Sequence, residues 1–333
     1  MALAVETTQQ TTLDARPTAV DGYYAIGLDC LYPELHAPCD LFRRQGKNQY
    51  VLWARQGLPF GIRSKENLRY YGTCELFVRE EEAVIFFDYL RKSLERIVRD
   101  PSTPPRRKAE AVHASCKEIL KKTFAEPRSQ FLGKAQEILK PTMDLIIHED
   151  AATKWLVQLT AYDHSTYNHS TNVGIFAIAL AKLIYGNAAA HDLRRLGAGF
   201  FLHDLGKCEV PLEIINKPGP LNDEEWGVVR RHPEEGFSLI ESAGILTPEA
   251  KIVSLQHHEK EDGSGYPLGL KKGDIHPYAR ICRLADVYEA LTSERPYHNQ
   301  RTTFEALKLM KEKVLADMDQ DLFEHFLQIF HVR

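Results

Sequence analysis

Histidine and aspartate residues interrupt the apolar segments in the second half of the chain. His203 and Asp204 follow directly after the apolar run at 199–202, and Asp286 stands inside another apolar run at 281–287. Two further positions repeat the pattern, namely His169 before the run at 173–183 and the pair His257-His258 after the run at 252–255. Burial of an imidazole or a carboxylate without a partner is costly, and metal coordination is one of the few arrangements that compensate for it. Each residue alone would favour a hydrogen-bonded core position, but together they favour a metal site.

The types of donor limit the metals and the chemistry. Imidazole and carboxylate ligands without thiolates suit iron, manganese or zinc rather than calcium or a thiolate-bound zinc. Two ions that share a carboxylate would polarise a phosphoryl oxygen and produce hydroxide from bound water near neutral pH. Cys208 lies near Asp204 but has no second cysteine at a ligand spacing, so we interpret it as a packing residue. Histidines in polar or amphipathic surroundings, such as His113 and His191, are interpreted as exposed or capping residues.

Helical periodicity dominates the chain after about residue 105 and accounts for the elements that must position these side chains. Asn222 precedes Asp-Glu-Glu and Thr247 precedes Pro248, which are signals for the starts of two helices. We therefore predict an all-α domain that carries every metal-binding candidate.

The N-terminal part of the chain has a different pattern. Residues 1–20 are rich in threonine and glutamine and are expected to form a disordered tail. Four short runs of aromatic and branched residues then predict strands, at 23–28, 39–44, 49–54 and 74–79, with helices near 65–70 and 81–98. We expect a small α/β regulatory domain over 21–100, a proline-rich linker and connecting helix over 101–128, and an all-α catalytic domain over 129–333. The predicted fold class is thus multidomain α+β.

Composition excludes several other classes of protein. The 333 residues are 44% hydrophobic and 26% charged, which is typical of a globular chain and excludes global disorder. A near balance of 42 basic and 46 acidic residues argues against a partner that is a nucleic acid polymer or a membrane surface. The six cysteines include no CxxC pair, and the N-terminus lacks the basic start and apolar run of a signal peptide. We expect a cytoplasmic protein without a membrane anchor.

Two long motifs and two shorter ones carry a resemblance to a known family. The segment His-Asp-Leu-Gly-Lys at 203–207 resembles the HD signature of the HD-domain metal-dependent phosphohydrolases. The segment HHEKEDGSGYP at 257–267 resembles the longer signature of their HD-GYP subfamily. HPEEG at 232–236 and ADVYEALTSERPY at 285–297 stand in the order of that family. The resemblance covers about 163–297.

This resemblance implies an all-helical HD-type catalytic domain that hydrolyses cyclic di-GMP, a bacterial second messenger, with two divalent ions, iron or manganese, per chain. One ion would take His169, His203, Asp204 and Asp286, and the other would take Asp204 as a bridge together with His232, His257 and His258. Opening of one linkage would give pGpG, whereas further conversion to GMP is associated with sites that hold three ions. Other cyclic dinucleotides remain open as substrates.

The same resemblance implies contacts to the substrate. Lys207 would contact the scissile phosphate, Arg295 would clamp a phosphate through its planar fork, and the loop of Gly265, Tyr266 and Pro267 would help to form the pocket. For each of these residues a simpler interpretation stays open: a solvated lysine, a surface ion pair for the arginine, and a tight turn for the loop.

Two departures from the family pattern affect the expected chemistry. Some members place a glutamate four residues before the first histidine and hold a third ion, whereas this chain has Ser165 there, near Asp163 and His164. We therefore favour two ions over three. The RPY motif is commonly followed by lysine or arginine, but here His298 follows, and a neutral imidazole binds phosphate more weakly than a charged one.

Two other classes of function compete with hydrolysis of cyclic di-GMP. A protein that binds a cyclic dinucleotide and acts through protein contacts would not need the complete set of ligands. A di-iron oxygenase on the HD scaffold would not need Lys207 or the GYP signature. The N-terminal domain carries no comparable motif, so its regulatory input is unknown, and a homodimer is an open alternative.

Overall fold

A computed structural model describes most of the chain. The described residues are 22–32, 36–46, 49–59, 61–160, 166–186, 191–244, 247–293, 301–314 and 318–330. Four sequence-based predictions lie outside them: the tail at 1–20, the segment 163–165 with Ser165, and the residues Arg295 and His298.

The N-terminal region is built on a small antiparallel sheet. Its strands are β1 (Tyr23–Gly27), β2 (Leu41–Arg44), β3 (Tyr50–Ala54) and β4 (Glu75–Arg79), in the spatial order β1-β4-β2-β3. All four predicted strands are therefore confirmed. Tyr24 and Ile26 alternate with less buried neighbours along β1, as expected for a sheet with one face against a core. The two predicted helices are also present, as α1 (Ile62–Tyr70) and α2 (Ala83–Arg99), with single 3-10 turns at η1 (Leu28–Cys30) and η2 (Glu80–Glu82).

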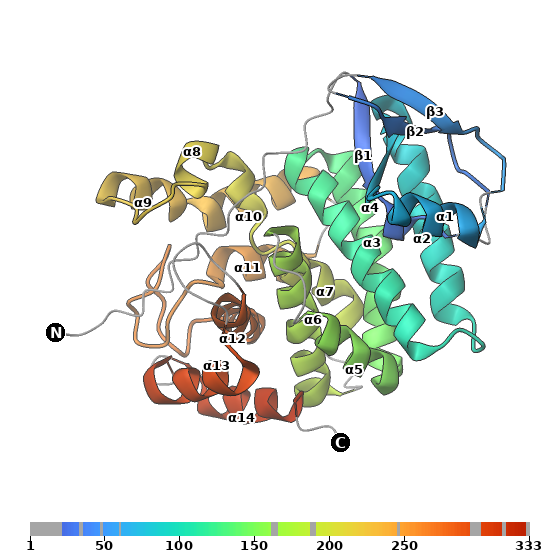
Figure 1. Ribbon diagram of the computed structural model, residues 1–333. Coiled ribbons are helices and arrows are strands. Elements are labelled where there is room, and N and C mark those ends of the chain that lie inside the picture. Colours follow the sequence, from blue (N-terminus) through green and yellow to red (C-terminus); the bar gives the residue numbers. More distant parts are fainter. Residues whose placement is uncertain are drawn as a thin grey trace.

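Helix α3 (Pro105–Ala125) lies between this sheet and the remaining helices (Figure 1). Glu118 on α3 accepts hydrogen bonds from the Tyr24 hydroxyl at 2.8 Å and from the Gly27 amide at 2.9 Å. Lys122 is fully buried and pairs with Glu80 and, at 2.6 Å, with Glu126. The predicted connecting helix is thus a core element: its buried charges pair with the N-terminal region, and it also packs against the helices that follow it.

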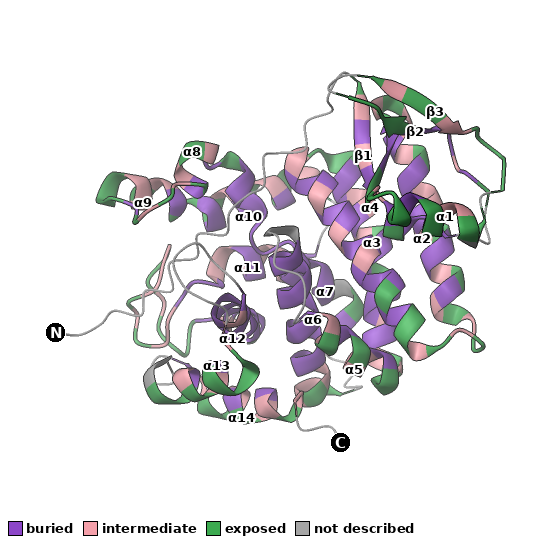
Figure 2. Cartoon of the chain, in the orientation of Figure 1, coloured by how far each residue is buried: buried purple, intermediate pink, exposed green. Residues whose placement is uncertain are grey.

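The C-terminal region is helical throughout its described length. Its elements are α4 (Ser129–His148), α5 (Asp150–Leu159), α6 (Thr166–Tyr185), α7 (Leu193–Phe201), η3 (Leu205–Glu209), α8 (Leu212–Ile215), α9 (Asp223–Val229), α10 (His232–Ala243), α11 (Pro248–Gln256), α12 (Pro277–Thr292), α13 (Thr303–Leu309), the π-helical turn η4 (Met310–Val314) and α14 (Gln320–Gln328). Figure 2 shows that α6 and α12 are buried along most of their length, whereas α13 and α14 expose one face. The pair formed by α6 and α12 is the centre of the helical region.

Local signals set the starts of two helices as predicted. Asn222 caps α9 in a reciprocal capping box with Glu225, and the Thr247 hydroxyl accepts from the amide of Ala250 at the start of α11. Within the described ranges, we find no helix with the length and apolar character needed to cross a membrane.

Candidate metal centre

Seven side chains from five helices and the segments that follow them converge in the middle of the helical region. None of the seven is more than 5% exposed. They are His169 on α6, His203 and Asp204 after α7, His232 at the start of α10, His257 and His258 after α11, and Asp286 on α12. The structure therefore brings together all seven residues named as candidate ligands. Gly206 permits this approach, because a Cβ atom there would lie only 1.9 Å from the carbonyl oxygen of His232.

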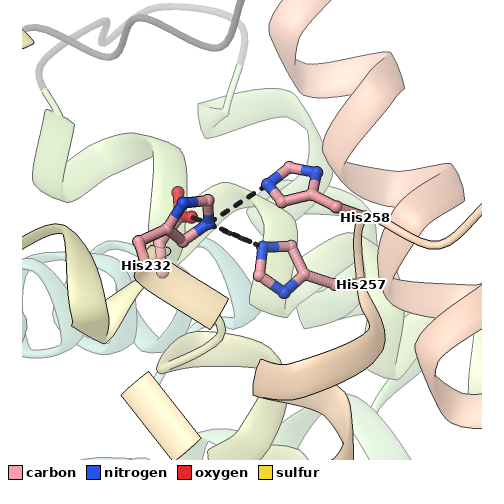
Figure 3. A group of neighbouring side chains, drawn as sticks. His232, His257 and His258 are labelled. Carbon is pink, nitrogen blue, oxygen red and sulfur yellow. Dashed lines mark hydrogen bonds and ion pairs between the residues drawn. The ribbon is translucent and has the colours of Figure 1, made fainter. Parts of the chain in front are cut away.

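Three histidines point their Nε2 atoms at one another (Figure 3). His232 Nε2 lies 3.2 Å from His257 Nε2 and 3.1 Å from His258 Nε2. Oδ1 of Asp204 lies 3.2 Å from His232 Nε2 and 3.5 Å from His257 Nε2. Three imidazole nitrogens and one carboxylate oxygen thus surround one point.

A second group lies on the other side of the same carboxylate. Oδ2 of Asp204 is 3.3 Å from His169 Nε2 and 3.4 Å from His203 Nε2. Asp286 adds a further oxygen, since its Oδ1 lies 3.2 Å from His169 Nε2. The two oxygens of Asp204 therefore face two different sets of donors.

The backbone determines which ring nitrogen carries the proton. Nδ1 of His203 donates to the carbonyl of Phe200 at 2.9 Å, and Nδ1 of His257 donates to that of Ser254 at 2.8 Å. His232 makes the same kind of bond, to Val229 at 2.7 Å. Because a carbonyl oxygen can only accept, each Nε2 keeps its lone pair and directs it into the centre.

Lone pairs that face one another need a cation between them. Among the described residues, Nε2 of His169, Nε2 of His203 and Oδ1 of Asp204 are buried without a hydrogen-bond partner. Such buried acceptors are costly unless an ion satisfies them, and imidazole with carboxylate is the donor set of iron, manganese and zinc. The residues present therefore fit divalent metal ions.

The electrostatics favour the protonation states that metal ligands require. Burial, reinforced by the neighbouring imidazoles, lowers the pKa of His257 to about 4 and that of His258 well below its usual value. Burial also lowers the pKa of His232. Burial alone would raise the pKa of Asp204, but the charge of Lys207, together with the neighbouring imidazoles, outweighs it and holds this pKa well below its usual range. The three imidazoles are thus neutral, and the carboxylate is charged, at neutral pH.

Lys207 does not point into solvent. Its side chain is 2% exposed, and its Nζ donates to Oδ2 of Asp204 at 2.6 Å. The alternative interpretation of a solvated lysine is therefore wrong, because one turn of the 3-10 helix η3 places the ammonium group over the carboxylate. Cys208 is buried, in agreement with its interpretation as a packing residue.

The GYP loop packs against His258 and His232 of the first group. The ring of Tyr266 stacks on that of His258, with the centroids 4.7 Å apart and the planes at 25°. Buried Glu259 holds the loop in place by accepting from the amides of Leu268 at 2.6 Å and Leu270 at 2.8 Å. At Gly265 a Cβ atom would lie 2.3 Å from the backbone nitrogen of Lys260. Pro267 follows in the same loop.

Some residues around the site were missed by sequence reasoning. Arg230 lies over the Tyr266 ring, with its Cζ 5.7 Å from the centroid. Glu289 pairs with Nδ1 of His169. Its place one helical turn after Asp286, in an apolar helix, is a signal that could have revealed it.

The interpretation of His113 and His191 as exposed or capping residues is also wrong. His113 is 9% exposed, and its Nε2 lies 3.4 Å from Oδ1 of Asn172. His191 is half-buried and bonds the Tyr278 hydroxyl at 2.5 Å. Both histidines have polar partners that lie far away in the sequence, which local composition does not reveal.

The seven candidate ligands lie within a segment of the chain that matches a known family. A family model described as an HD domain matches residues 160–322. The protein of Pseudomonas aeruginosa named cyclic di-GMP phosphodiesterase PA4108 is 38% identical over 178 residues, which are 54% of this chain and 42% of that protein. The protein of Vibrio cholerae named 3'3'-cGAMP-specific phosphodiesterase 3 is 33% identical over 159 residues, which are 47% of this chain and 34% of that protein. The chain thus spans less than half the length of these curated relatives.

One solved structure resembles almost the whole chain. It is Bd1817, a HDG"Y"P protein from Bdellovibrio bacteriovorus, with a TM-score of 0.70 and 19% sequence identity. The match covers 93% of this chain and 100% of that one, so the two proteins share their fold over most of the chain. Residues 160–322 are thus an HD domain, and the HD and GYP motifs within this segment identify it as a member of the HD-GYP subfamily.

Proposed function

We propose that this chain is a metal-dependent phosphodiesterase that opens one linkage of cyclic di-GMP and releases linear pGpG. The observation that carries the proposal is the position of Asp204, whose two oxygens face two sets of donors. A shared carboxylate suits a pair of neighbouring ions, and such pairs act on phosphodiesters by stabilising both the attacking and the leaving oxygen. The names of the relatives support a cyclic dinucleotide as the substrate, and one of them supports a mixed-base ring as the alternative.

The proposed site holds two divalent ions, iron or manganese. One ion would be bound by His169, His203, Asp204 and Asp286, and the other by Asp204, His232, His257 and His258. Both sets contain nitrogen and carboxylate donors without thiolate, which suits these metals. Ser165 is a poor ligand compared with a carboxylate, and this supports two ions rather than three and pGpG rather than GMP.

The protein contributes position and charge to this reaction. When bound, the ions supply Lewis acidity and lower the pKa of a coordinated water towards neutrality. Lys207 is placed to stabilise negative charge on a phosphoryl oxygen, because its ammonium group already lies beside Asp204 in a buried site. The loop of Gly265, Tyr266 and Pro267 forms one wall of the substrate pocket. Arg295 and His298 are proposed to bind phosphate from the following segment.

The N-terminal part of the chain is proposed to regulate the catalytic domain. We propose that residues 21–100 form a regulatory domain, joined through 101–128 to the catalytic domain at 129–333. The burial of paired charges between α3 and the sheet supports transmission of a signal through this helix, since the two parts pack as one core.

Product analysis on metal-loaded protein tests the proposed function. Protein prepared with iron(II) without oxygen, or with manganese(II), is incubated with cyclic di-GMP, and the products are separated by chromatography. We expect pGpG to accumulate, two ions per chain by elemental analysis, and equal turnover without oxygen. Stable cyclic di-GMP in the presence of two bound ions would favour the sensor alternative, and turnover that needs oxygen would favour the oxygenase. Arg295→Ala should retain both ions but bind the substrate more weakly.

A further inference from the structure

A second carboxylate of α12 contacts the metal centre from behind. Glu289 is 2% exposed and lies one turn after Asp286 on the same helix. Its Oε2 pairs with Nδ1 of His169, the ring nitrogen that faces away from Asp204. Neither the proposed ligand sets nor the proposed reaction uses this carboxylate. Burial of a carboxylate costs free energy, so we expect the contact between Glu289 and His169 to serve a function that offsets this cost.

We propose that Glu289 is a positioning residue that sets the tautomer and orientation of His169 for one of the two metal ions. This inference rests on the proposed metal site but not on the identity of the substrate. A carboxylate can only accept at Nδ1, so the proton of the neutral imidazole stays on that nitrogen. The lone pair of Nε2 then points between Asp204 and Asp286, whose oxygens lie 3.3 and 3.2 Å away.

His169 differs from three other candidate ligands in the partner of its Nδ1. His203, His232 and His257 each donate from Nδ1 to a backbone carbonyl of the preceding turn. Each of these carbonyls lies three residues before its histidine, whereas the partner of His169 is Glu289 on another helix, 120 residues away in the chain. An ionised partner also makes the opposite nitrogen a stronger donor, which is the usual effect of a carboxylate behind a metal-bound imidazole.

Glu289 is itself held from two sides. The Ser293 hydroxyl donates to its Oε1 at 2.5 Å, and the Asn172 side-chain amide donates to the same oxygen at 3.3 Å. Asn172 and His169 lie one turn apart on α6, so both ends of the contact belong to the tightly packed pair of α6 and α12. The carboxylate therefore cannot turn away from Nδ1 without loss of these bonds, as a positioning residue requires.

Metal-binding measurements on Glu289 variants test the proposal. Glu289→Leu removes the acceptor, and Glu289→Gln keeps the shape but removes the charge. We expect Glu289→Leu to bind one of the two manganese(II) ions about 10- to 100-fold more weakly, with a smaller loss in Glu289→Gln. The other ion, at His232, His257 and His258, should bind as in the unaltered protein. Isothermal titration calorimetry with manganese(II) measures the affinity for each ion, and elemental analysis after dialysis measures how many ions stay bound.

Glu118→Gln is the matched control, because Glu118 is also a buried, hydrogen-bonded glutamate but contacts Tyr24 and Gly27 instead of a candidate ligand. It should lower the melting temperature and leave the affinity for both ions unchanged. If Glu289→Leu does not fold, the affinity of Glu289→Gln decides. Unchanged affinity for both ions in a folded Glu289 variant overturns the proposal.

The result is independent of the substrate. If the unaltered protein binds two ions but does not hydrolyse cyclic di-GMP, the substrate assignment fails and the role of Glu289 is still measured. If the unaltered protein binds no ion, the metal site itself fails, and with it this inference. A spectroscopic readout gives a further check: in protein loaded with diamagnetic zinc(II), ¹⁵N signals of the His169 ring should show the proton on Nδ1 and the metal on Nε2, and should show a mixture of the two ring orientations in Glu289→Leu.

Discussion

The ammonium group of Lys207 donates to Oδ2 of Asp204 over 2.6 Å, and both side chains are 2% exposed. The lysine thus neutralises part of the charge of the carboxylate that faces both groups of histidines. Oδ2 of Asp204 faces the group with His169, and Oδ1 faces the group with His232, so this one carboxylate can serve both groups.

Removal of this carboxylate should empty the site. In Asp204→Asn we expect the loss of both ions and of at least 99% of turnover, because no oxygen of comparable charge would be left to bridge them. Elemental analysis and product chromatography on the same preparation measure both quantities. Asp262→Asn, at an exposed aspartate of the GYP loop, should keep both ions. Full metal content in Asp204→Asn would contradict the shared-carboxylate assignment.

Substitution of Lys207 should lower the rate of the reaction and leave metal binding unchanged. Lys207→Gln is expected to keep both ions and to lower kcat by about 10²- to 10³-fold, the usual effect of losing one preorganised charge at a transition state. Lys207→Arg should recover part of the rate if the charge alone is needed. The measurement is kcat and metal content together. A kcat within twofold of the unaltered protein would exclude a catalytic role for this lysine.

Glu259 should control the GYP loop rather than the ions. Glu259→Gln replaces a charged acceptor of two backbone amides by one neutral oxygen, and such a loss costs about 1.5–3 kcal/mol of stability. We expect a higher KM for cyclic di-GMP, because Tyr266 would be less well held, with an unchanged number of bound ions. Denaturant unfolding and steady-state kinetics measure these effects. Glu261→Gln, at a neighbouring glutamate that pairs with Lys272, is the control and should leave KM unchanged.

The buried histidines should make the metal-free protein sensitive to acid. His257 has a pKa of about 4 in the folded protein, and the pKa values of His232 and His258 are also lowered by burial. Below about pH 6.5 the unfolded chain takes up protons that the folded protein does not bind, so the free energy of unfolding falls as the pH decreases towards 4. His257 alone contributes on the order of 3 kcal/mol to this fall. The pKa of His169 is raised instead, because Glu289 outweighs its burial, so His169 is protonated in both states and adds no slope in this range.

Urea denaturation of metal-free protein at pH 7 and at pH 4.5 tests this prediction. The difference in unfolding free energy should become smaller in His257→Asn and stay the same in His36→Gln, where the histidine is exposed. A stability that does not change between the two pH values would contradict the assignment of neutral buried imidazoles.

Local patterns in the sequence were sufficient to predict the strands and helices and to select the candidate metal ligands. Alternating and helical apolar spacing predicted the four strands and the helices near them, because each pattern repeats over a few residues. The caps at Asn222 and Thr247 were readable for the same reason, since their hydrogen bonds span three residues. The positions of His203, Asp204, His257 and His258 within motifs were sufficient to predict them as candidate metal ligands.

Tertiary packing decided the features that depend on distant parts of the chain. Lys207 is buried beside Asp204 rather than solvated because the turn η3, which carries it, packs against α10. This packing cannot be read from the residues next to Lys207 in the sequence. Helix α3 is part of the core because its buried Glu118 and Lys122 find partners in the N-terminal region. Glu289 reaches His169 across 120 residues because α6 and α12 pack along their length. A residue's type limits which partners it can accept, but only the fold brings those partners within the few ångströms over which a hydrogen bond or a metal ligand acts.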